Sequence, residues 1–394
     1  MSSSNKKHTF YTLGCRANQY QTEVIKNQLT TNNSQLTTFS NAADVYVINT
    51  CMVTEDAERK SRQAIRRAFR QNPKAKIIIT GCWARLESEK IEKLFPEAEI
   101  KPPQSLLPTA YSILPRVRSN LMIQDGCEHF CSYCIVPYAR GKFSSKPQEQ
   151  VIEEARHLID AGAREIVLTG INLGAYGDLC SVLRALCSIP KLLRLRLSSI
   201  EPMYLTKELI DAVASTPKVC HHLHIPLQSG DNSILAAMNR KYSREDFLEL
   251  IHYARAKMPE CGLTTDIIVG FPGEGEKEFQ NTVNLVNQIK FSRLHVFSYS
   301  QRKGTSAATM SNQINTATKK KRNKIMRDLG QKLMVDFAKN YLNTEVSILV
   351  EQKGEGLTSN FIRCFFNNPH DSSGSLRKTF ARFVNNSGEI REVR

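Results

Sequence analysis

The sequence lacks a long apolar run. Its first residues, Met1–Lys7, are polar and contain no hydrophobic segment of the kind that secretory signals carry. No stretch approaches the roughly 18 apolar residues that a membrane-spanning helix needs. A repeat period of the solenoid type is also missing. We therefore expect a soluble, cytoplasmic protein that has no membrane partner.

The sequence also lacks an even number of cysteines, since it has 11 of them. An odd number cannot complete a disulfide framework, and a large intracellular chain rarely carries one. The cysteines are therefore expected to be buried thiols or metal ligands.

Acidic residues are scarce relative to basic ones, with 38 Asp and Glu against 54 Lys and Arg and a net charge of +16. This excess predicts an acidic partner, and nucleic acid is favoured over a merely basic surface because the charges are clustered. The chain has 394 residues, of which 41% are hydrophobic, so two or three domains with real cores are expected.

The first hundred residues repeat one pattern three times: an apolar, β-prone run ends in cysteine and a helical segment follows. The runs are His8–Cys15, Asp44–Cys51 and Lys76–Cys82. Alternating strands and helices predict an open parallel sheet. Open α/β sheets place their ligands at the carboxyl ends of the strands, so the three cysteines should meet at one edge. The alternative, three ordinary buried thiols, is common in proteins.

The rest of the chain predicts a linker, a barrel and a small β domain. We expect an N-terminal domain over 1–95 and a proline-rich linker over 96–120. A partial (β/α)6 barrel followed by a basic helix is expected over 121–342, and a β-rich domain over 343–394. The expected barrel strands are Leu121–Gln124, Glu165–Thr169, Leu193–Ser198, His222–Leu227, Thr264–Val269 and Leu294–Tyr299.

The sharpest chemical signal is a loop with three closely spaced cysteines, Cys127-x-x-x-Cys131-x-x-Cys134. Thiolates are the usual protein ligands of iron–sulfur clusters. A four-iron cluster on three cysteines leaves one iron open, as catalytic metal sites leave a position for substrate. The alternatives are a zinc site, for which His129 is the nearest fourth ligand, and three unrelated buried cysteines.

This spacing resembles the signature of the radical S-adenosylmethionine (SAM) superfamily, and more segments resemble one branch of it, the methylthiotransferases. The segments that carry the resemblance, in order, are Thr12–Gln19 (TLGCRANQ), Asn49–Thr54 (NTCMVT), Gly81–Ala84 (GCWA), Asp125–Gly141 (DGCEHFCSYCIVPYARG), Pro226–Gly230 (PLQSG), Met238–Tyr242 (MNRKY), Asp266–Gly273 (DIIVGFPG) and Tyr299–Thr305 (YSQRKGT).

The resemblance implies two [4Fe–4S] clusters and SAM as cofactors, and a C-terminal domain of the TRAM type. Cys127, Cys131 and Cys134 would hold the cluster that cleaves SAM, and Cys15, Cys51 and Cys82 an auxiliary cluster. One SAM would supply a methyl group and a second a radical. A reductant protein such as flavodoxin or ferredoxin would supply the electron. Tyr133 matches the family's aromatic position near the SAM adenine. From their places at or near strand ends, the other candidate SAM contacts are Thr169, Gly170, Glu201, Gln228 and Asp266, with a solvated or capping role as the alternative. Arg302 is a candidate contact of the substrate or of the SAM carboxylate.

The opening motif is most similar to the branch that adds a methylthio group to C2 of N6-threonylcarbamoyladenosine at position 37 of tRNA, in the anticodon loop. Sister branches act on N6-isopentenyladenosine in tRNA or on an aspartate of a ribosomal protein. Basic clusters at 59–70, 319–322 and 377–382 favour RNA, since they suit a phosphate backbone. From a different class, the chain could be a non-catalytic iron–sulfur regulator that binds RNA.

The remaining cysteines and the histidines near 222 carry no expected metal site. Cys180, Cys187, Cys220, Cys261 and Cys364 match no ligand spacing and are expected to be structural. No carboxylate pattern accompanies His221, His222 and His224, so no metal is expected there either.

Overall fold

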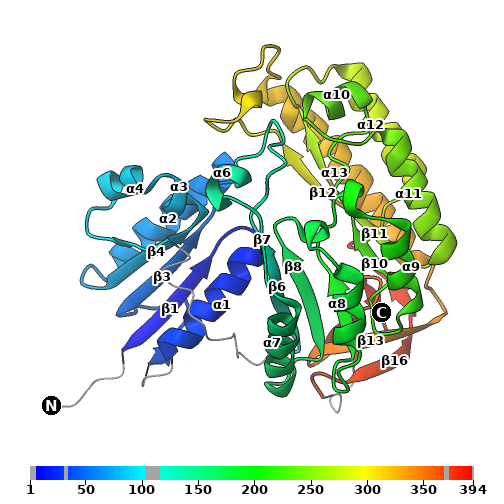
Figure 1. The fold of residues 1–394 in the computed structure, drawn as a ribbon, viewed down its shortest axis with the longest axis horizontal. Coiled ribbons are helices and arrows are strands. Elements are labelled where there is room, and N and C mark those ends of the chain that lie inside the picture. Colours follow the sequence, from blue (N-terminus) through cyan, green and yellow to red (C-terminus); the bar gives the residue numbers. More distant parts are fainter. Residues whose placement is uncertain (1–5, 31–33, 103–115, 368–371, 393–394) are drawn as a thin grey trace. The chain divides into compact units, whose positions relative to one another are not determined.

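The computed structural model describes residues 6–30, 34–102, 116–367 and 372–392. The chain forms two compact units (Figure 1). Unit 1 falls within Met1–Leu114, Asp125–Ser144 and Ser300–Ala308, and unit 2 within Pro115–Gln124, Ser145–Tyr299 and Thr309–Arg394. The loop with the three close cysteines therefore belongs to the same unit as the three earlier cysteines.

Unit 1 is a parallel sheet, as predicted, and helices lie on both of its faces. The strand order is β2-β1-β3-β4-β5, and every pair is parallel. The strands are β1 (Lys7–Thr12), β2 (Gln35–Leu36), β3 (Val45–Thr50), β4 (Lys76–Gly81) and β5 (Glu99–Ile100). The helices are α1 (Arg16–Thr30), α2 (Glu55–Gln71), α3 (Cys82–Leu86), α4 (Ser88–Leu94), α6 (Val136–Arg140) and the 3-10 turn η3 (Ser306–Ala308).

The two faces of this sheet bury alternate residues of the same strands. Val47 packs with Ile25 of α1 on one face, while Ile48 packs with Ile65 of α2 on the other. The strand β3 is buried throughout, which suits a central parallel strand covered on both sides. Thr54 caps α2 by accepting a hydrogen bond from the Ala57 amide at 3.1 Å.

The predicted linker needs correction at both ends. Its first part contains β5, which pairs with β4, because Ile100 extends the apolar run of the sheet. Its last part is already the first barrel strand, which begins at Arg118. The middle of the predicted linker, 103–115, lies outside the described residues.

Unit 2 contains a partial barrel of six parallel strands, as predicted. The barrel strands are β6 (Arg118–Asp125), β8 (Glu165–Gly170), β9 (Arg194–Leu197), β10 (His222–His224), β11 (Gly262–Val269) and β12 (Arg293–Ser298), with a short β7 (Ser144–Ser145) beside β6. They form sheets of order β7-β6-β8-β9 and β10-β11-β12. Single bridges, Leu195 to Val219 and Ser199 to His224, join β9 to the β10 segment.

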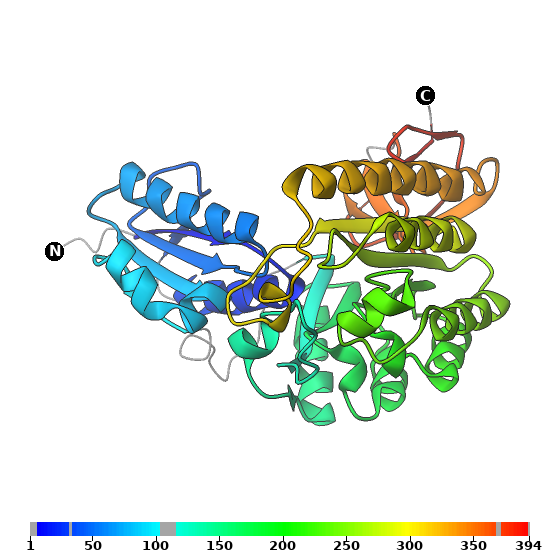
Figure 2. The same cartoon turned by 90° about the horizontal axis from the view of Figure 1, so that it is seen from above.

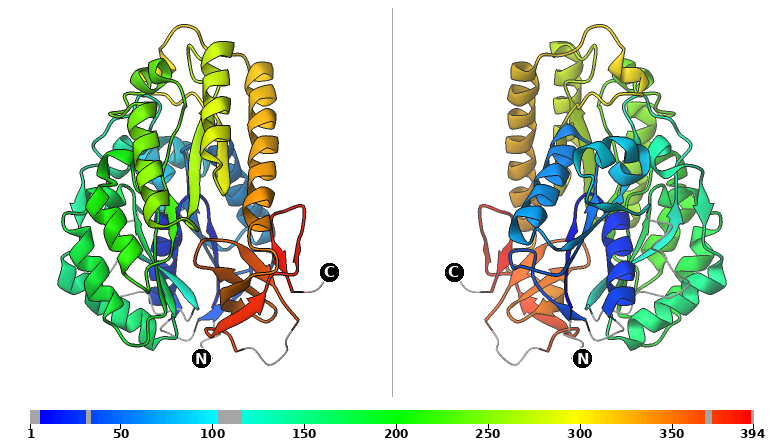
Figure 3. Two further views of the ribbon diagram at one scale, coloured as in Figure 1. Left: turned by 90° about the vertical axis from the view of Figure 1, so that its right-hand side faces the viewer. Right: turned by 90° about the vertical axis from the view of Figure 1, so that its left-hand side faces the viewer.

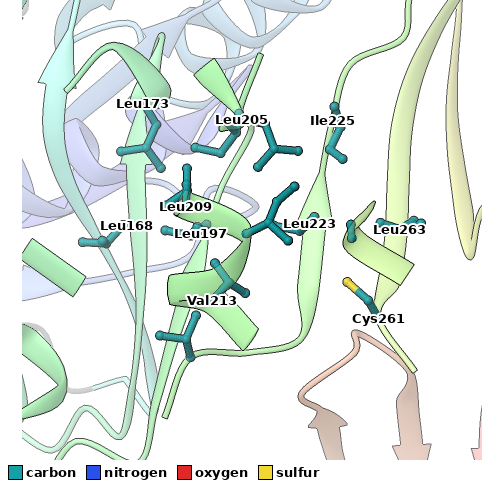
Figure 4. Close-up of a cluster of buried hydrophobic side chains, with 14 of the residues drawn as sticks. Leu168, Leu173, Leu197, Leu205, Leu209, Val213, Leu223, Ile225, Cys261 and Leu263 are labelled. Carbon is teal, nitrogen blue, oxygen red and sulfur yellow. The ribbon is translucent and has the colours of Figure 1, made fainter. Parts of the chain in front are cut away.

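Helices cover the outer face of the barrel. They are α7 (Gln148–Asp160), α8 (Leu179–Cys187), α9 (Lys207–Ser215), α10 (Asn232–Ala237), α11 (Arg244–Lys257), α12 (Glu276–Ile289) and α13 (Thr316–Lys339), with 3-10 turns η1 (Leu173–Ala175) and η2 (Pro202–Tyr204). Figure 2 shows α13 lying along β12. Figure 4 shows Leu209 of α9 beside Leu197 of β9 and Leu223 of β10, so alternate strand residues point outward into this core. Within the described ranges, every helix is too short or too polar to cross a membrane.

A six-stranded, largely antiparallel sheet follows α13 and lies at the amino end of the barrel strands (Figure 3). Its strands are β13 (Glu345–Gln352), β14 (Glu355–Thr358), β15 (Arg363–Phe365), β16 (Leu376–Phe380), β17 (Phe383–Val384) and β18 (Ile390–Arg391). Two barrel arginines donate to the backbone of this sheet: Arg194 to Leu357 O at 2.6 Å and Arg196 to Ser359 O at 2.8 Å.

A buried ion cluster holds this junction together. Glu165 of β8 is fully buried and accepts from Arg196 at 2.7 Å and from Arg118 at 2.9 Å. Burial alone would raise the pKa of Glu165, but the two guanidinium groups outweigh it and hold the pKa at about 2. The Arg196 guanidinium also lies over the Phe361 ring, 5.1 Å from its centroid. The loop after β14 therefore closes the amino end of the barrel interior.

We expect Glu165→Gln to destabilise the protein by about 3–5 kcal/mol, because it leaves two buried guanidinium groups without their carboxylate. The folded pKa of Glu165 lies below the ordinary value of about 4.3. Its contribution is therefore complete above about pH 5 and is lost as the pH falls toward 2. Urea unfolding should show that the difference in free energy of unfolding between wild type and variant becomes smaller as the pH falls over that range. Glu208→Gln, at an exposed residue of α9, should leave stability unchanged.

Candidate functional site

Three cysteines meet at the carboxyl edge of the unit 1 sheet, as predicted. Cys51 directly follows β3 and Cys82 directly follows β4, while Cys15 lies three residues beyond β1. The register aligns these ends, since Thr12 pairs with Asn49 and Thr50 pairs with Gly81. Cysteines that are more than thirty residues apart in the chain therefore occupy neighbouring positions on one edge of the sheet.

Two glycines allow the close approach. Gly14 has φ +95°, and a Cβ added there would lie 2.9 Å from Cys51 Sγ. Gly81 has φ +94°, and a Cβ there would lie 2.3 Å from Thr50 O. Both positions combine a left-handed backbone with backbone or sulfur contact, which only glycine accepts without displacement.

An amide network ties the cysteine loops to each other. Asn18 Nδ2 donates to Leu13 O at 2.8 Å and to Thr50 O at 3.1 Å. Asn49 Nδ2 donates to Asn18 O at 2.9 Å. The Ser61 hydroxyl of α2 makes two hydrogen bonds with the Cys51 backbone: it accepts from the amide at 3.2 Å and donates to the carbonyl at 3.1 Å. The sulfur positions are therefore held by buried hydrogen bonds rather than by loose loops.

Burial governs the ionisation of two thiols of this cysteine trio. Burial raises the pKa of the Cys51 thiol to about 11, and the neighbouring thiols of Cys82 and Cys15 act in the same direction. Burial also raises the pKa of Cys82, against the opposing effect of Arg140, which donates a hydrogen bond to it. Thiols that hold their protons this firmly become thiolates when a metal ion or cluster replaces those protons.

Arg140 connects this trio with the loop that carries the other three cysteines. Its side chain is buried and donates to Asn18 Oδ1, to Asp125 Oδ1 at 3.2 Å and to Cys82. Arg140 ends α6, which directly follows that loop. It places a positive charge beside the sulfur atoms of Cys15 and Cys82.

The loop of Cys127, Cys131 and Cys134 is closed at its base. The Cys127 amide donates to Gly141 O at 3.3 Å, and the Cys134 amide donates to Cys131 O at 2.9 Å. Phe130 has φ +46°, which turns the chain between the first two cysteines. All three cysteines are half-buried, as is the neighbouring Tyr133. The loop therefore offers three thiols that a ligand can reach.

A third segment of unit 1, 300–308, packs against this loop. The Ala307 amide donates to Ser132 O at 2.7 Å. Arg302 is buried and donates to Glu58 Oε2 at 2.7 Å. Burial would raise the pKa of Glu58, but hydrogen bonds from Arg302 and Lys90 lower it. The structure thus gives Arg302, a predicted SAM contact, an ionic partner on α2 beside the cysteine loops.

The other predicted SAM contacts lie in unit 2, mostly at the carboxyl ends of barrel strands. Thr169 and Gly170 end β8, and Gly170 lies close to the Gln124 side chain. Gln228 follows β10 with φ +66°. Glu201 follows β9 and pairs with Arg240. Their positions agree with the edge where barrel chemistry is expected.

Asp266 differs from these, because it lies within β11 and not at its end. Its carboxylate contacts two imidazoles, His224 Nε2 at 3.3 Å and His295 Nδ1 at 3.2 Å. Burial would raise the pKa of Asp266, yet hydrogen bonds from the two histidines lower it strongly. The expectation that no carboxylate accompanies His224 is therefore wrong: the carboxylate comes from the neighbouring strand.

Comparison with known proteins decides the family. A model of the radical SAM superfamily matches residues 121–286, and a model described as uncharacterized protein family UPF0004 matches residues 7–101. The threonylcarbamoyladenosine tRNA methylthiotransferase MtaB of Bacillus subtilis is 37% identical, with 94% of this chain and 92% of that protein covered. The chain belongs to the radical SAM methylthiotransferase family.

Two further comparisons concern a second relative by sequence and a solved structure with a similar fold. The tRNA-2-methylthio-N6-dimethylallyladenosine synthase of Alkaliphilus oremlandii is 34% identical, with 88% of this chain and 82% of that protein covered. The solved structure of the radical SAM methyltransferase TsrM from Kitasatospora setae matches with a TM-score of 0.56 and 14% identity, covering 77% of each chain. The latter likeness concerns the fold alone.

Membership makes the chain an enzyme of the transferase class that uses SAM and [4Fe–4S] chemistry. The donor set fits such a group, because three reachable thiols share one loop and three more share one sheet edge. The five cysteines expected to be structural stand apart from both sets in sequence. Cys220, for example, is fully buried against Glu165 and Arg196, and burial raises its pKa to about 12.

Sequence reasoning missed the polar residues that support the cysteines. Asn18 and Arg140 stand inside the motifs that resemble the family, but nothing in their spacing shows that they meet. Glu58 gives no signal at all, since it looks like one more charge on a surface helix. Its partner is 244 residues away in the chain.

Replacing Cys15, Cys51 and Cys82 together with alanine is expected to lower the iron of anaerobically reconstituted protein from about eight to about four atoms per chain. The remaining iron should be lost only when Cys127, Cys131 and Cys134 are replaced as well. Cys180→Ala and Cys187→Ala serve as matched controls. Full iron in the first triple variant would contradict two separate ligand sets.

Arg140→Gln is expected to make the reduction potential of the cluster on the first trio more negative, because it removes a buried positive charge beside Cys15 and Cys82. We expect a shift of roughly 60 mV or more, which corresponds to a tenfold change in a one-electron equilibrium. Redox titration followed by EPR measures it. Arg70→Gln, at an exposed residue in the last turn of α2, is the control, and an unchanged potential in Arg140→Gln would argue against the role.

Proposed function

We propose that this chain adds a methylthio group to C2 of N6-threonylcarbamoyladenosine at position 37 of tRNA. The observation that carries the proposal is the match to threonylcarbamoyladenosine tRNA methylthiotransferases over most of both chains. The two cysteine trios support it, because the reaction needs both a radical source and a sulfur carrier. A reductant protein of the flavodoxin or ferredoxin type would supply the electron.

The two trios would have separate roles. With the cofactors bound, Cys127, Cys131 and Cys134 would hold the cluster and SAM that supply the radical, and Cys15, Cys51 and Cys82 would hold the cluster that carries the sulfur. Asn18 and Asn49 keep the sheet-edge loops in one geometry. The Glu58–Arg302 pair ties the 300–308 segment to α2, and the Ala307 amide ties the same segment to the three-cysteine loop at Ser132.

SAM itself would be recognised by residues near the strand ends. The proposed contacts are Tyr133 on the cysteine loop, Thr169 and Gly170 after β8, Glu201 after β9, Gln228 after β10 and Arg302 on the 300–308 segment. Gly170 lets neighbouring groups approach its strand end closely, since a Cβ there would lie 2.8 Å from Gln124 Oε1 and 2.9 Å from Leu173 Cα. Glu201 is held in place by Arg240, which also donates to Tyr242.

The proposed tRNA contacts are exposed cations on two helices. On α2, Arg66 and Arg70 extend from the surface of unit 1. On α13, Lys320 and Arg327 line a groove with Lys324 and Asp328. Arg322, predicted to belong to this basic run, is instead buried and donates to Glu274 at 2.9 Å, so it does not contribute to the surface. Such cations suit the phosphates of a folded RNA.

Nucleoside mass spectrometry of tRNA tests the substrate. Reduced, cluster-loaded enzyme with SAM should convert threonylcarbamoyladenosine in purified tRNA to its 2-methylthio form and release 5′-deoxyadenosine. tRNA that carries N6-isopentenyladenosine should remain unmodified. Conversion of the second tRNA only would assign the chain to the sister branch, and release of no 5′-deoxyadenosine would leave it a non-catalytic RNA-binding protein.

The groove on α13 gives a matched pair of charge variants. Lys320→Gln and Arg327→Gln should weaken tRNA binding, and each should reduce the slope of log affinity against log salt by about one, because one phosphate is no longer neutralised. Lys324→Gln should have little effect, because Lys324 is already paired with Asp328 at 2.6 Å. Equal effects of all three variants in fluorescence anisotropy would argue against phosphate binding in this groove.

A further inference from the structure

Three neighbouring strands of unit 2 bring two imidazoles and a carboxylate together. His224 ends β10, Asp266 lies in β11 and His295 lies in β12. Asp266 and His295 are directly paired across the two strands, and His224 pairs with Thr264, two residues before Asp266. All three lie on the face opposite to Leu223, Ile267 and Val296, which pack toward the outer core.

Two of the three separations match those of ligands around one metal ion. His224 Nε2 and His295 Nδ1 lie 3.3 and 3.2 Å from the same oxygen, Asp266 Oδ1. The three ligand atoms all lie within 4.8 Å of one another. Nitrogen and oxygen ligands about 2.0–2.2 Å from a metal ion are about 3.0–3.5 Å apart in tetrahedral or octahedral geometry.

A hydroxyl orients one of the imidazoles. His224 Nδ1 lies 2.9 Å from Thr264 Oγ1, which also lies 3.2 Å from His222 Nε2. In one tautomer His224 Nε2–H donates to Asp266. In the other, Thr264 donates its proton to His222 and accepts from His224 Nδ1–H, and His224 Nε2 then directs a lone pair toward Asp266. Two acceptors 3.3 Å apart repel unless a proton or a metal ion lies between them. Such outer hydrogen bonds are typical of metal-binding histidines.

The three side chains of the trio differ in exposure. His222 stacks on Phe361, with ring centroids 4.6 Å apart. Phe361 belongs to the loop that closes the amino end of the barrel, so this loop packs against the strand residue that precedes the trio by two positions. The exposed fractions of the side chains rise from 13% for His224 to 25% for Asp266 and 43% for His295. An ion can therefore reach the trio from the open edge at β12.

We propose that His224, Asp266 and His295 bind one divalent transition-metal ion, separate from the iron of the cysteine trios. Two imidazoles and one carboxylate are a ligand set that suits zinc and iron(II). Three protein ligands leave at least one coordination position for water or for an anionic group. This site does not depend on the proposed substrate, and Asp266 then serves as a metal ligand and not as a SAM contact.

Zinc binding to the cluster-loaded full chain tests the site, since loaded cysteines no longer compete for the ion. After removal of loosely bound metal, equilibrium dialysis against Zn²⁺ with elemental analysis should give one zinc per chain in addition to unchanged iron. His295→Ala and Asp266→Asn should each weaken zinc binding at least about 10–100-fold, the loss that even outer-shell changes cause. Thr264→Val should also weaken zinc binding by about 10–100-fold, because this variant keeps all three ligands but loses the hydroxyl that orients His224.

His221→Ala is the matched control, because His221 lies beside the trio in sequence but pairs with Glu260. It should retain the zinc. Zinc should also raise the melting temperature of the wild type and not that of Asp266→Asn, provided that circular dichroism shows both folded. If Asp266→Asn does not fold, His295→Ala replaces it, since His295 is the most exposed ligand. Absence of zinc from the wild type, or equal zinc in His295→Ala and wild type, would overturn the proposal.

Discussion

The parallel register of β1, β3 and β4 is the constraint on which the rest of unit 1 depends. It converts three cysteines distant in sequence into one group, because each follows its strand at the same sheet edge. A slip of one residue in any pair would turn that strand's buried residues to the wrong face. The hydrophobic packing on both faces thus holds the ligand geometry, and the glycines at 14 and 81 only permit it.

A second constraint, the buried ion cluster at Glu165, performs the equivalent task in unit 2. It links β6, β8 and β9 through Arg118 and Arg196. Arg196 also donates to the backbone after β14, and Arg118 also pairs with the Glu351 side chain of the C-terminal sheet. Such clusters are costly to desolvate, so their value lies more in defining one arrangement than in net stability. Here the arrangement positions Phe361 at the amino end of the barrel, where its ring packs between the Arg196 guanidinium and the His222 imidazole.

The sequence was sufficient for the features that depend on local pattern. The strand runs ending in Cys15, Cys51 and Cys82, the six barrel strands and the basic helix α13 all follow from periodicity, and the structure contains them. The strand β5 escaped prediction, because two residues carry no periodicity and only pairing with β4 defines them. Arg322 escaped for another reason: its burial depends on Glu274, which a count of charges cannot reveal.

Pairing between strands explains the largest gap between prediction and structure. Alternation along one strand shows which side chains share a face, so the inward direction of His224 and Asp266 could be anticipated separately. Which residue of β11 stands beside His224 depends on register, and register depends on the packing of Leu223, Ile267 and Val296 on the opposite face. A chemical group assembled from three strands is therefore invisible in any one of them. The apolar residues that carry no chemistry decide which polar residues meet.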